Sequence, residues 1–138
     1  YAARFADGRY DEPENLGEAI NSRFDEFEAC LTPDESALIV MSVRAGGRGQ
    51  GDLYVSHQRD GAWSALEILD DPVSTAGFEV GPHVSPDGKE LFFSSTRSEP
   101  FDPGAGQLDF VQLSKRLNSP GNGLGDIYRI DISVLETR

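Results

Sequence analysis

Short runs of hydrophobic and β-branched residues, separated by turn-forming residues, recur along this chain. Each run has five to seven residues, and Gly, Pro, Asp, Asn or Ser lies between consecutive runs, a pattern typical of strands. No segment of ten or more residues places hydrophobic residues at helical spacing, and only residues 15–21 favour a helical turn. We predict strands at residues 26–31, 37–43, 52–56, 63–69, 79–84, 91–95 and 125–130.

In each half of the chain, one four-residue turn follows the first predicted strand. Ser85-Pro86-Asp87-Gly88 fits a type I turn, because Pro at the second position and Gly at the fourth are both favoured. Thr32-Pro33-Asp34-Glu35 occupies the matching place but ends on glutamate. Because glutamate lacks the conformational freedom of glycine, we expect this turn to end differently. In both turns the aspartate is expected to accept backbone N–H groups rather than to act in catalysis.

The two halves of the chain are related by a repeat without gaps. Tyr1 returns as Tyr54, 53 positions later, and 11 of the 44 aligned positions are identical. Ordinary composition would give roughly three identities by chance. A period near 50 residues indicates repeated supersecondary units. The residues of the first half that return are Tyr1, Asp7, Gly8, Glu14, Leu16, Glu26, Pro33, Asp34, Leu38, Ser42 and Arg44.

Four short strands in each unit favour a β-propeller blade, a four-stranded antiparallel sheet that buries its faces against neighbouring blades. We therefore predict an all-β fold with about two such blades. Residues 1–138 would form a single partial propeller domain, with repeat units at about 1–53 and 54–138. The first residues align with the third strand of a blade, and so do the last predicted strand residues.

Two blades are fewer than the four to eight that usually close a propeller. We favour the explanation that the chain is a fragment of a larger protein. The main alternative is a ring completed by two or three copies of the chain, which makes it a self-assembling half-propeller and a homo-oligomer. Blades lost by processing are a third explanation. An incomplete propeller exposes blade faces and sheet edges, and both favour association.

The motifs resemble a known family. Residues 85–97 are similar to the Ser-Pro-Asp-Gly-Lys repeat of TolB-type, WD-like β-propellers, and residues 8–21 are similar to the connector between blades in one subgroup. Residues 61–64 and 125–128 fit the same subgroup. It occurs in bacterial cell-envelope proteins, often fused to OmpA-like peptidoglycan-binding domains. The resemblance implies a non-catalytic binding or scaffold module, periplasmic or secreted, with a protein or glycan partner in the envelope.

Composition narrows the range of partners. Asp and Glu number 24 against 12 Lys and Arg, and the formal net charge is −12. This charge repels phosphate backbones and anionic lipid, so we expect neither a nucleic acid partner nor docking on a membrane. No run of 18 apolar residues is present, so no membrane insertion is expected. Cys30 is the one cysteine and has no partner for an intramolecular disulfide.

Two carboxylates and two arginines repeat at matching places. Glu26 and Glu79 begin the first strand of their blades, and Arg44 and Arg97 follow the second strand. The first strand of a blade lines the central channel, so these carboxylates would ring its mouth and offer oxygen ligands to a hard cation such as calcium. An ion pair with the arginines that ties neighbouring blades is the interpretation we favour. No other cofactor is expected.

The sequence gives catalysis little support. His83 lies in a predicted inner strand and is a candidate ligand contact, but neither histidine shows metal-ligand spacing. No serine is marked as a nucleophile beside a base. We predict no catalytic residue and no metal site. A propeller-fold hydrolase acting on glycans or peptides is the alternative function, and it rests on analogy with other propellers.

The second unit carries an insertion that breaks the repeat. Asp52 aligns with Asp126, 74 positions later rather than 53, so 21 extra residues lie near 98–124. Exposed apolar side chains on an insertion form a natural contact surface, whereas packing of residues 108–113 on their own blade is the alternative. The candidate partner contacts are Phe101, Phe110 and Leu113.

Overall fold

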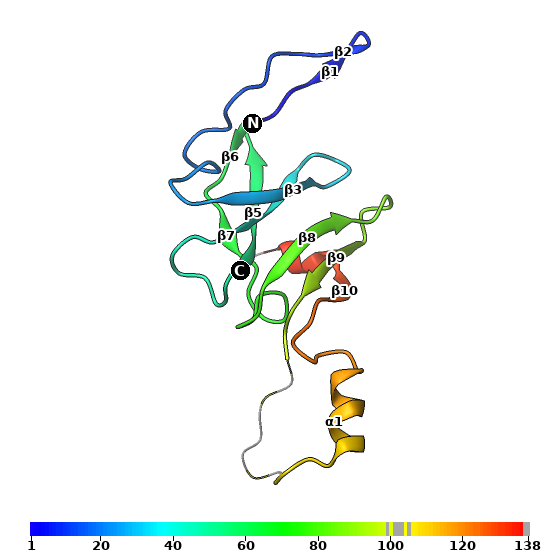
Figure 1. Cartoon of the computed structure of the whole chain (residues 1–138). Helices are drawn as coiled ribbons and strands as arrows, with labels where there is room; N and C mark the ends of the chain where they lie inside the picture. The colour runs from blue at the N-terminus through cyan, green and yellow to red at the C-terminus, as the bar shows by residue number, and fades with distance from the viewer. Residues whose placement is uncertain (99, 101–103, 105, 137–138) are drawn as a thin grey trace.

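The computed structural model describes residues 1–98, 100, 104 and 106–136. Antiparallel β-structure dominates it, which confirms the all-β prediction. Two sheets lie side by side, a short hairpin extends from one end of the molecule, and a helix projects from the other end (Figure 1). No helix in the described part of the chain is long and apolar enough to cross a membrane.

The first sheet is an antiparallel meander. Strands β3 (Glu26–Leu31), β4 (Ala37–Ser42) and β5 (Asp52–Arg59) lie next to one another in chain order. The fourth strand, predicted at 63–69, is instead two short strands that both pair with β5. The interruption lies where the Leu66 N–H donates to the carbonyl of Ala19, at 3.4 Å, in the connector that precedes the sheet. The two short strands are β6 (Ala62–Trp63) and β7 (Glu67–Ile68).

The second sheet has three strands in the described residues. Strands β8 (Glu79–Val84), β9 (Glu90–Ser95) and β10 (Asp126–Asp131) again follow chain order. Helix α1 (Phe110–Leu117) lies in the insertion between β9 and β10, and the 3₁₀ helix η1 (Ile132–Leu135) follows β10. Within the described residues this sheet therefore corresponds to β3, β4 and β5 of the first sheet, and a fourth strand is absent from that part of the chain.

The sequence repeat is also a repeat of strand pairing. In both sheets a bulge interrupts the first pair of strands, and on it Glu28 and Gly81 have positive φ, 52° and 62°. Every residue pair of one ladder recurs 53 positions later in the other. The pairs are Glu26↔Ser42, Phe27↔Met41, Cys30↔Ile39 and Leu31↔Leu38 in the first sheet, and Glu79↔Ser95, Val80↔Ser94, His83↔Phe92 and Val84↔Leu91 in the second.

The N-terminal hairpin belongs to the same repeat. Strands β1 (Phe5–Ala6) and β2 (Arg9–Tyr10) pair in the register of β5 with β6, shifted by 53 positions. The connecting turns, Asp7-Gly8 and Asp60-Gly61, have positive φ at both residues, 51° and 78° in the first and 51° and 80° in the second. Two such residues make the type I′ turn that suits the twist of a hairpin.

Both predicted type I turns form, with an N–H from the fourth residue to the first carbonyl at 2.8 Å for Gly88 and 2.9 Å for Glu35. The expectation that Glu35 ends its turn differently is wrong, because its φ is 58°, close to the 71° of Gly88. The neighbouring Asp34 carboxylate accepts the Ser36 N–H at 3.1 Å and the Ser36 hydroxyl at 2.8 Å. These bonds hold the glutamate in a conformation that would otherwise be unfavourable.

Asp34 should make stability depend on acid pH. Hydrogen bonds from Thr32 and Ser36 lower the pKa of Asp34 to about 2, below its ordinary value of about 4. Because the folded pKa is lowered, the stabilisation is complete above about pH 4 and is lost as the pH falls through about 2. At about pH 5 we expect the melting temperature of the wild type to be higher than that of Asp34→Asn. This difference in melting temperature should narrow near about pH 2. Melting curves followed by circular dichroism test this, and a gap that stays constant would contradict it.

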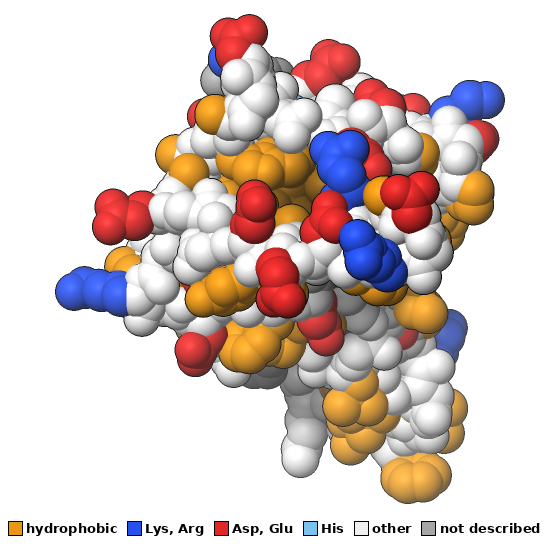
Figure 2. Space-filling view, turned by 90° about the horizontal axis from the view of Figure 1, so that it is seen from above, with side chains coloured by type: hydrophobic (Ala, Val, Ile, Leu, Met, Phe, Trp, Pro, Cys, Tyr) orange, Lys and Arg blue, Asp and Glu red, His pale blue; other side chains and the backbone are white. Residues whose placement is uncertain are grey.

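The main hydrophobic core lies between the two sheets. Ile39, Leu53 and Val55 of the first sheet are each 0% exposed, and Leu91 and Phe93 of the second sheet belong to the same cluster. Hydrophobic side chains also remain on the surface. From the end of the molecule that carries the N-terminal hairpin, they gather in patches and a hollow between scattered acidic side chains (Figure 2).

Candidate functional site

A buried polar network surrounds Glu79 at the start of β8. Its side chain is 0% exposed, and its carboxylate accepts the hydroxyls of Thr75 and Ser95, each at 2.6 Å, and the Thr75 N–H at 2.9 Å. The Arg97 guanidinium lies 3.9 Å from the same carboxylate and donates to the Val73 carbonyl at 2.6 Å. Donors from its own sheet and connector therefore occupy the Glu79 carboxylate.

The first unit builds the same network around Glu26. Its carboxylate accepts the Ser22 hydroxyl at 2.5 Å, the Ser22 N–H at 3.2 Å and the Arg44 guanidinium at 3.0 Å. Arg44 also donates to the Ile20 carbonyl at 3.3 Å. Each residue lies 53 positions before its counterpart, so the predicted pairing of glutamate with arginine is confirmed in both units.

The position of these ion pairs differs from the expectation. They join residues of one sheet instead of tying neighbouring blades, because each arginine follows the strand that pairs with its glutamate. Among the described residues, the two arginines reach beyond their sheet to carbonyls of the preceding connector. The guanidinium carbon of Arg44 lies 5.0 Å from the ring centre of Tyr54, and that of Arg97 lies 4.3 Å from the ring centre of Tyr128. The arginine thus fixes the connector and an aromatic ring to its sheet.

The same carboxylates were the candidates for a calcium site. Burial acts to raise the pKa of Glu26, but hydrogen bonds from Ser22 and Arg44 outweigh it and lower the pKa below its ordinary value. Among the residues that the structure describes, no group of three or more His, Cys, Asp or Glu side chains could hold a metal ion. We expected the Glu79 carboxylate to line the mouth of an open channel, but Glu79 is buried.

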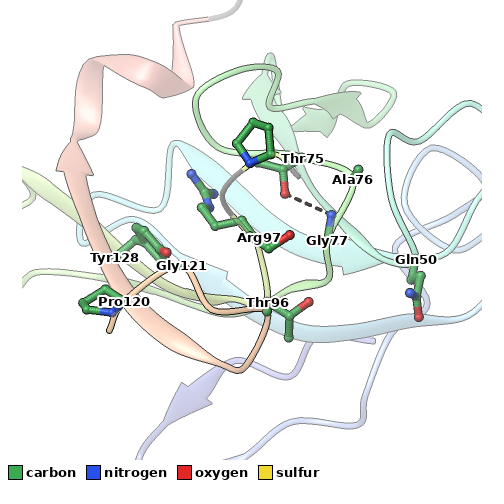
Figure 3. Close-up of a pocket in the computed structure, with 12 residues that line it drawn as sticks. Gln50, Thr75, Ala76, Gly77, Thr96, Arg97, Pro120, Gly121 and Tyr128 are labelled. Carbon is green, nitrogen blue, oxygen red and sulfur yellow. Dashed lines mark hydrogen bonds between the residues drawn. The ribbon is translucent and has the colours of Figure 1, made fainter. Parts of the chain in front are cut away.

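A cavity of about 720 Å³ opens beside Arg97 (Figure 3). The loop that contains Gln50, the connector at Thr75 and Gly77, and the end of the insertion at Pro120 border it. Arg97 and the ring of Tyr128 also line it. The cavity therefore lies where the insertion rejoins the second sheet.

Most polar groups around this cavity are already engaged. The Thr75 hydroxyl oxygen accepts the Gly77 N–H at 3.1 Å, and the Thr96 hydroxyl oxygen accepts the Phe78 N–H at 3.0 Å. A side chain on Gly77 would come within 2.9 Å of the Arg97 backbone nitrogen, so only glycine fits there. The described lining residues include no Asp, Glu, His, Cys or Lys. Arg97, Thr75, Thr96 and Tyr128 nonetheless give the lining a polar character.

His83 lies apart from this cavity. It is exposed on β8 and pairs with Phe92, on the face of the second sheet turned away from the core. Its counterpart Cys30 packs against the core. The other histidine, His57, donates from Nε2 to the carbonyl of Leu135 at 3.0 Å. Neither histidine is among the residues that line the Arg97 cavity.

The insertion presents helix α1, in which no residue is buried. Phe110 is 83% and Leu113 is 44% exposed, as expected of a contact surface. That they contact a partner stays a prediction. Phe101, the third candidate, lies outside the described residues. Leu117, 55% exposed, shares the face of Phe110 and Leu113, because residues at i, i+3 and i+7 align on a helix.

The helix itself was not predicted. Its eight residues fall below the ten-residue window in which helical spacing was sought. The signal that would have found it is the capping box: the Asp109 carboxylate accepts the Gln112 N–H at 2.8 Å, and the Gln112 side chain accepts the Asp109 N–H at 3.0 Å. Three further residues that complete the two networks were not predicted from the sequence: Ser22, Thr75 and Tyr128.

Comparisons with known proteins add no assignment. A scan against protein-family models, a search of curated proteins and a search of solved structures all gave no match. The resemblance to TolB-type propellers therefore stays a prediction that rests on the motifs of the chain.

Proposed function

We propose that this protein is a non-catalytic binding module, built from propeller-type blades, that contacts a partner through its insertion. The observation that carries the proposal is α1, a capped helix with an exposed apolar face formed by Phe110, Leu113 and Leu117. Amphipathic helices of this kind bind by laying their apolar face into a groove of a partner.

The division between repeated and unrepeated residues supports this proposal. The repeated residues that could bind a ligand are the two glutamates and the two arginines. Their side chains are engaged in hydrogen bonds and ion pairs within each unit. The insertion has no counterpart in the first unit, and its end at Pro120 and Gly121 borders the Arg97 cavity. The helix and the cavity together give the partner an apolar surface and a polar pocket at one end of the second sheet.

A protein is the partner class that α1 favours. A continuous apolar stripe matches a hydrophobic groove, whereas glycans are held mainly by hydrogen bonds and isolated aromatic rings. The family resemblance supports a partner in the bacterial cell envelope, and placement of the protein in the periplasm belongs to the same proposal.

The proposal predicts that α1 determines partner capture. The partner for the test is a protein recovered from envelope extract by the wild-type chain. We expect it to bind the double variant Phe110→Lys/Leu117→Lys at least about tenfold more weakly than the wild type, because both apolar anchors are lost. Lysine is a good helix former, so the helix itself is preserved. Ile127→Lys is the matched control, since Ile127 is 82% exposed but lies outside the insertion. Titration calorimetry with the recovered protein gives the affinities. Equal affinity for all three chains would rule out α1 as the contact.

A further inference from the structure

The two sheets use equivalent faces in different ways. The face of the first sheet that packs on the second is apolar, and all its residues but the partly buried Cys30 are buried. Its residues are Cys30, Ala37, Ile39, Met41, Leu53 and Val55. The strand registers give the equivalent positions of the second sheet, on the face turned away from the core. These are His83, Glu90, Phe92, Ser94, Ile127 and Arg129.

This outward face of the second sheet is open, and four of its six side chains are polar, whereas Phe92 and Ile127 are apolar. Glu90 and Arg129 form an ion pair at 3.2 Å, with side chains 38% and 64% exposed. Ile127, the equivalent of the fully buried Leu53, is 82% exposed. If another blade packed against this face, the charged groups of Glu90 and Arg129 would lose their hydration. Solvent or a polar surface suits it better than a neighbouring blade.

The chain after β10 also departs from the repeat. In the first unit β5 continues to Arg59 and turns back into β6. In the second unit the Asp131 side chain accepts the Ser133 N–H at 2.9 Å and caps η1. Leu135 of η1, 5% exposed, then joins the core between the sheets. At the offset of 74 positions, η1 thus takes the place of residues 58–61, which end β5 and form the hairpin turn in the first unit.

The opposite end of the molecule is built for packing. Val80, Val84, Leu91 and Phe93 of the second sheet face the first sheet and belong to, or pack against, the core. Their counterparts 53 positions earlier line an open cavity of about 420 Å³, and two of them are each 46% exposed. Those counterparts are Phe27, Leu31, Leu38 and Val40, of which Phe27 and Leu31 are the exposed pair.

We propose that this N-side face, defined by Phe27, Leu31, Leu38 and Val40, is a docking face for one further blade of the same repeat, and that the second sheet is an end blade. The occupant is a sheet presenting small and branched apolar side chains, as β4 and β5 do. The interface within this chain is the template, because the same repeat positions form its receiving side. End units with a polar outer face are what repeat arrays need for solubility.

A variant that carries the occupant's face tests the proposal. The outward face of the second sheet is converted to the pattern of the first, and Leu31→Glu is added so that this probe cannot associate with itself. The substitutions that convert it are Glu90→Ala, Phe92→Ile, Ser94→Met, Ile127→Leu and Arg129→Val. Sedimentation velocity should show a one-to-one complex of this probe with wild type, at about twice the 15.0 kDa of the single chain.

The complex must depend on the N-side face of the wild-type chain. We expect Leu31→Glu in the wild-type partner to weaken it at least about tenfold, whereas Phe110→Lys, on the other side of the molecule, leaves it unchanged. Binding that survives Leu31→Glu, or no binding by a folded probe, would overturn the proposal. Self-association of wild type that Leu31→Glu abolishes would also overturn it, by making a second copy the occupant. A milder probe with only Glu90→Ala, Arg129→Val and Leu31→Glu repeats the test if the full set does not fold.

Discussion

Glu79→Ala is expected to lower the free energy of unfolding by about 3–5 kcal/mol, the usual cost of removing one partner from a buried ion pair. The carboxylate is fully buried and accepts the hydroxyls of Thr75 and Ser95 and the Thr75 N–H. Without it these donors lose their acceptor, and Arg97 keeps a charge without its anionic partner. The Glu79 side chain is 0% exposed in the folded protein, so most of the cost should appear as lost stability.

Urea unfolding of three variants measures this effect. Glu79→Gln keeps one oxygen that accepts hydrogen bonds, so its loss should be smaller than that of Glu79→Ala. Glu26→Ala removes the equivalent carboxylate of the first unit, whose side chain is 11% exposed, and water can replace part of what is lost. A loss in Glu79→Ala no larger than in Glu26→Ala would show that the two networks are equally accessible to water, contrary to the structure.

Local features of the fold could be predicted from the sequence because they depend on neighbouring residues. The strands predicted at 26–31 and 79–84 have the same bounds in β3 and β8. Both Pro-Asp turns form where their residues placed them. Glu35 is the exception, because only the assembled turn shows that hydrogen bonds from Asp34 hold it at positive φ.

The candidate site could be predicted only in part. Glutamate and arginine were found because both repeat, but their hydroxyl partners include Ser22 and Thr75, which differ between the units and attracted no attention. The burial of Glu79 was also missed. It results from packing between sheets, and a carboxylate at a strand end gives no local sign of it.

The difference between the two sheet faces needed the strand register. Ala37 and Glu90 are repeat equivalents, and so are Val55 and Arg129, but the second pair is separated by 74 positions because of the insertion. Sequence alone gave both offsets. Only the ladders β4–β5 and β9–β10 show that these positions share one face of their sheet.

Leu53→Ala and Ile127→Ala should have very different effects although they alter equivalent positions. Leu53 is 0% exposed in the core between the sheets, and its truncation should cost about 2–5 kcal/mol through lost burial and the cavity left behind. Ile127 is 82% exposed, and its truncation should change the free energy of unfolding by no more than about 0.5 kcal/mol. Both substitutions remove an aliphatic side chain from the third strand of a repeat unit, so each is the control for the other.

The central claim is that the equivalent faces of the two sheets differ: that of the first sheet is buried in the core, whereas that of the second sheet faces outward. The difference in unfolding free energy between these two variants tests this claim most directly. Urea unfolding of both proteins under one condition, followed by circular dichroism, provides it. We predict a large loss for Leu53→Ala and almost none for Ile127→Ala. Similar losses for both would mean that the outward face of the second sheet is buried in the same way as the core, and would contradict the account.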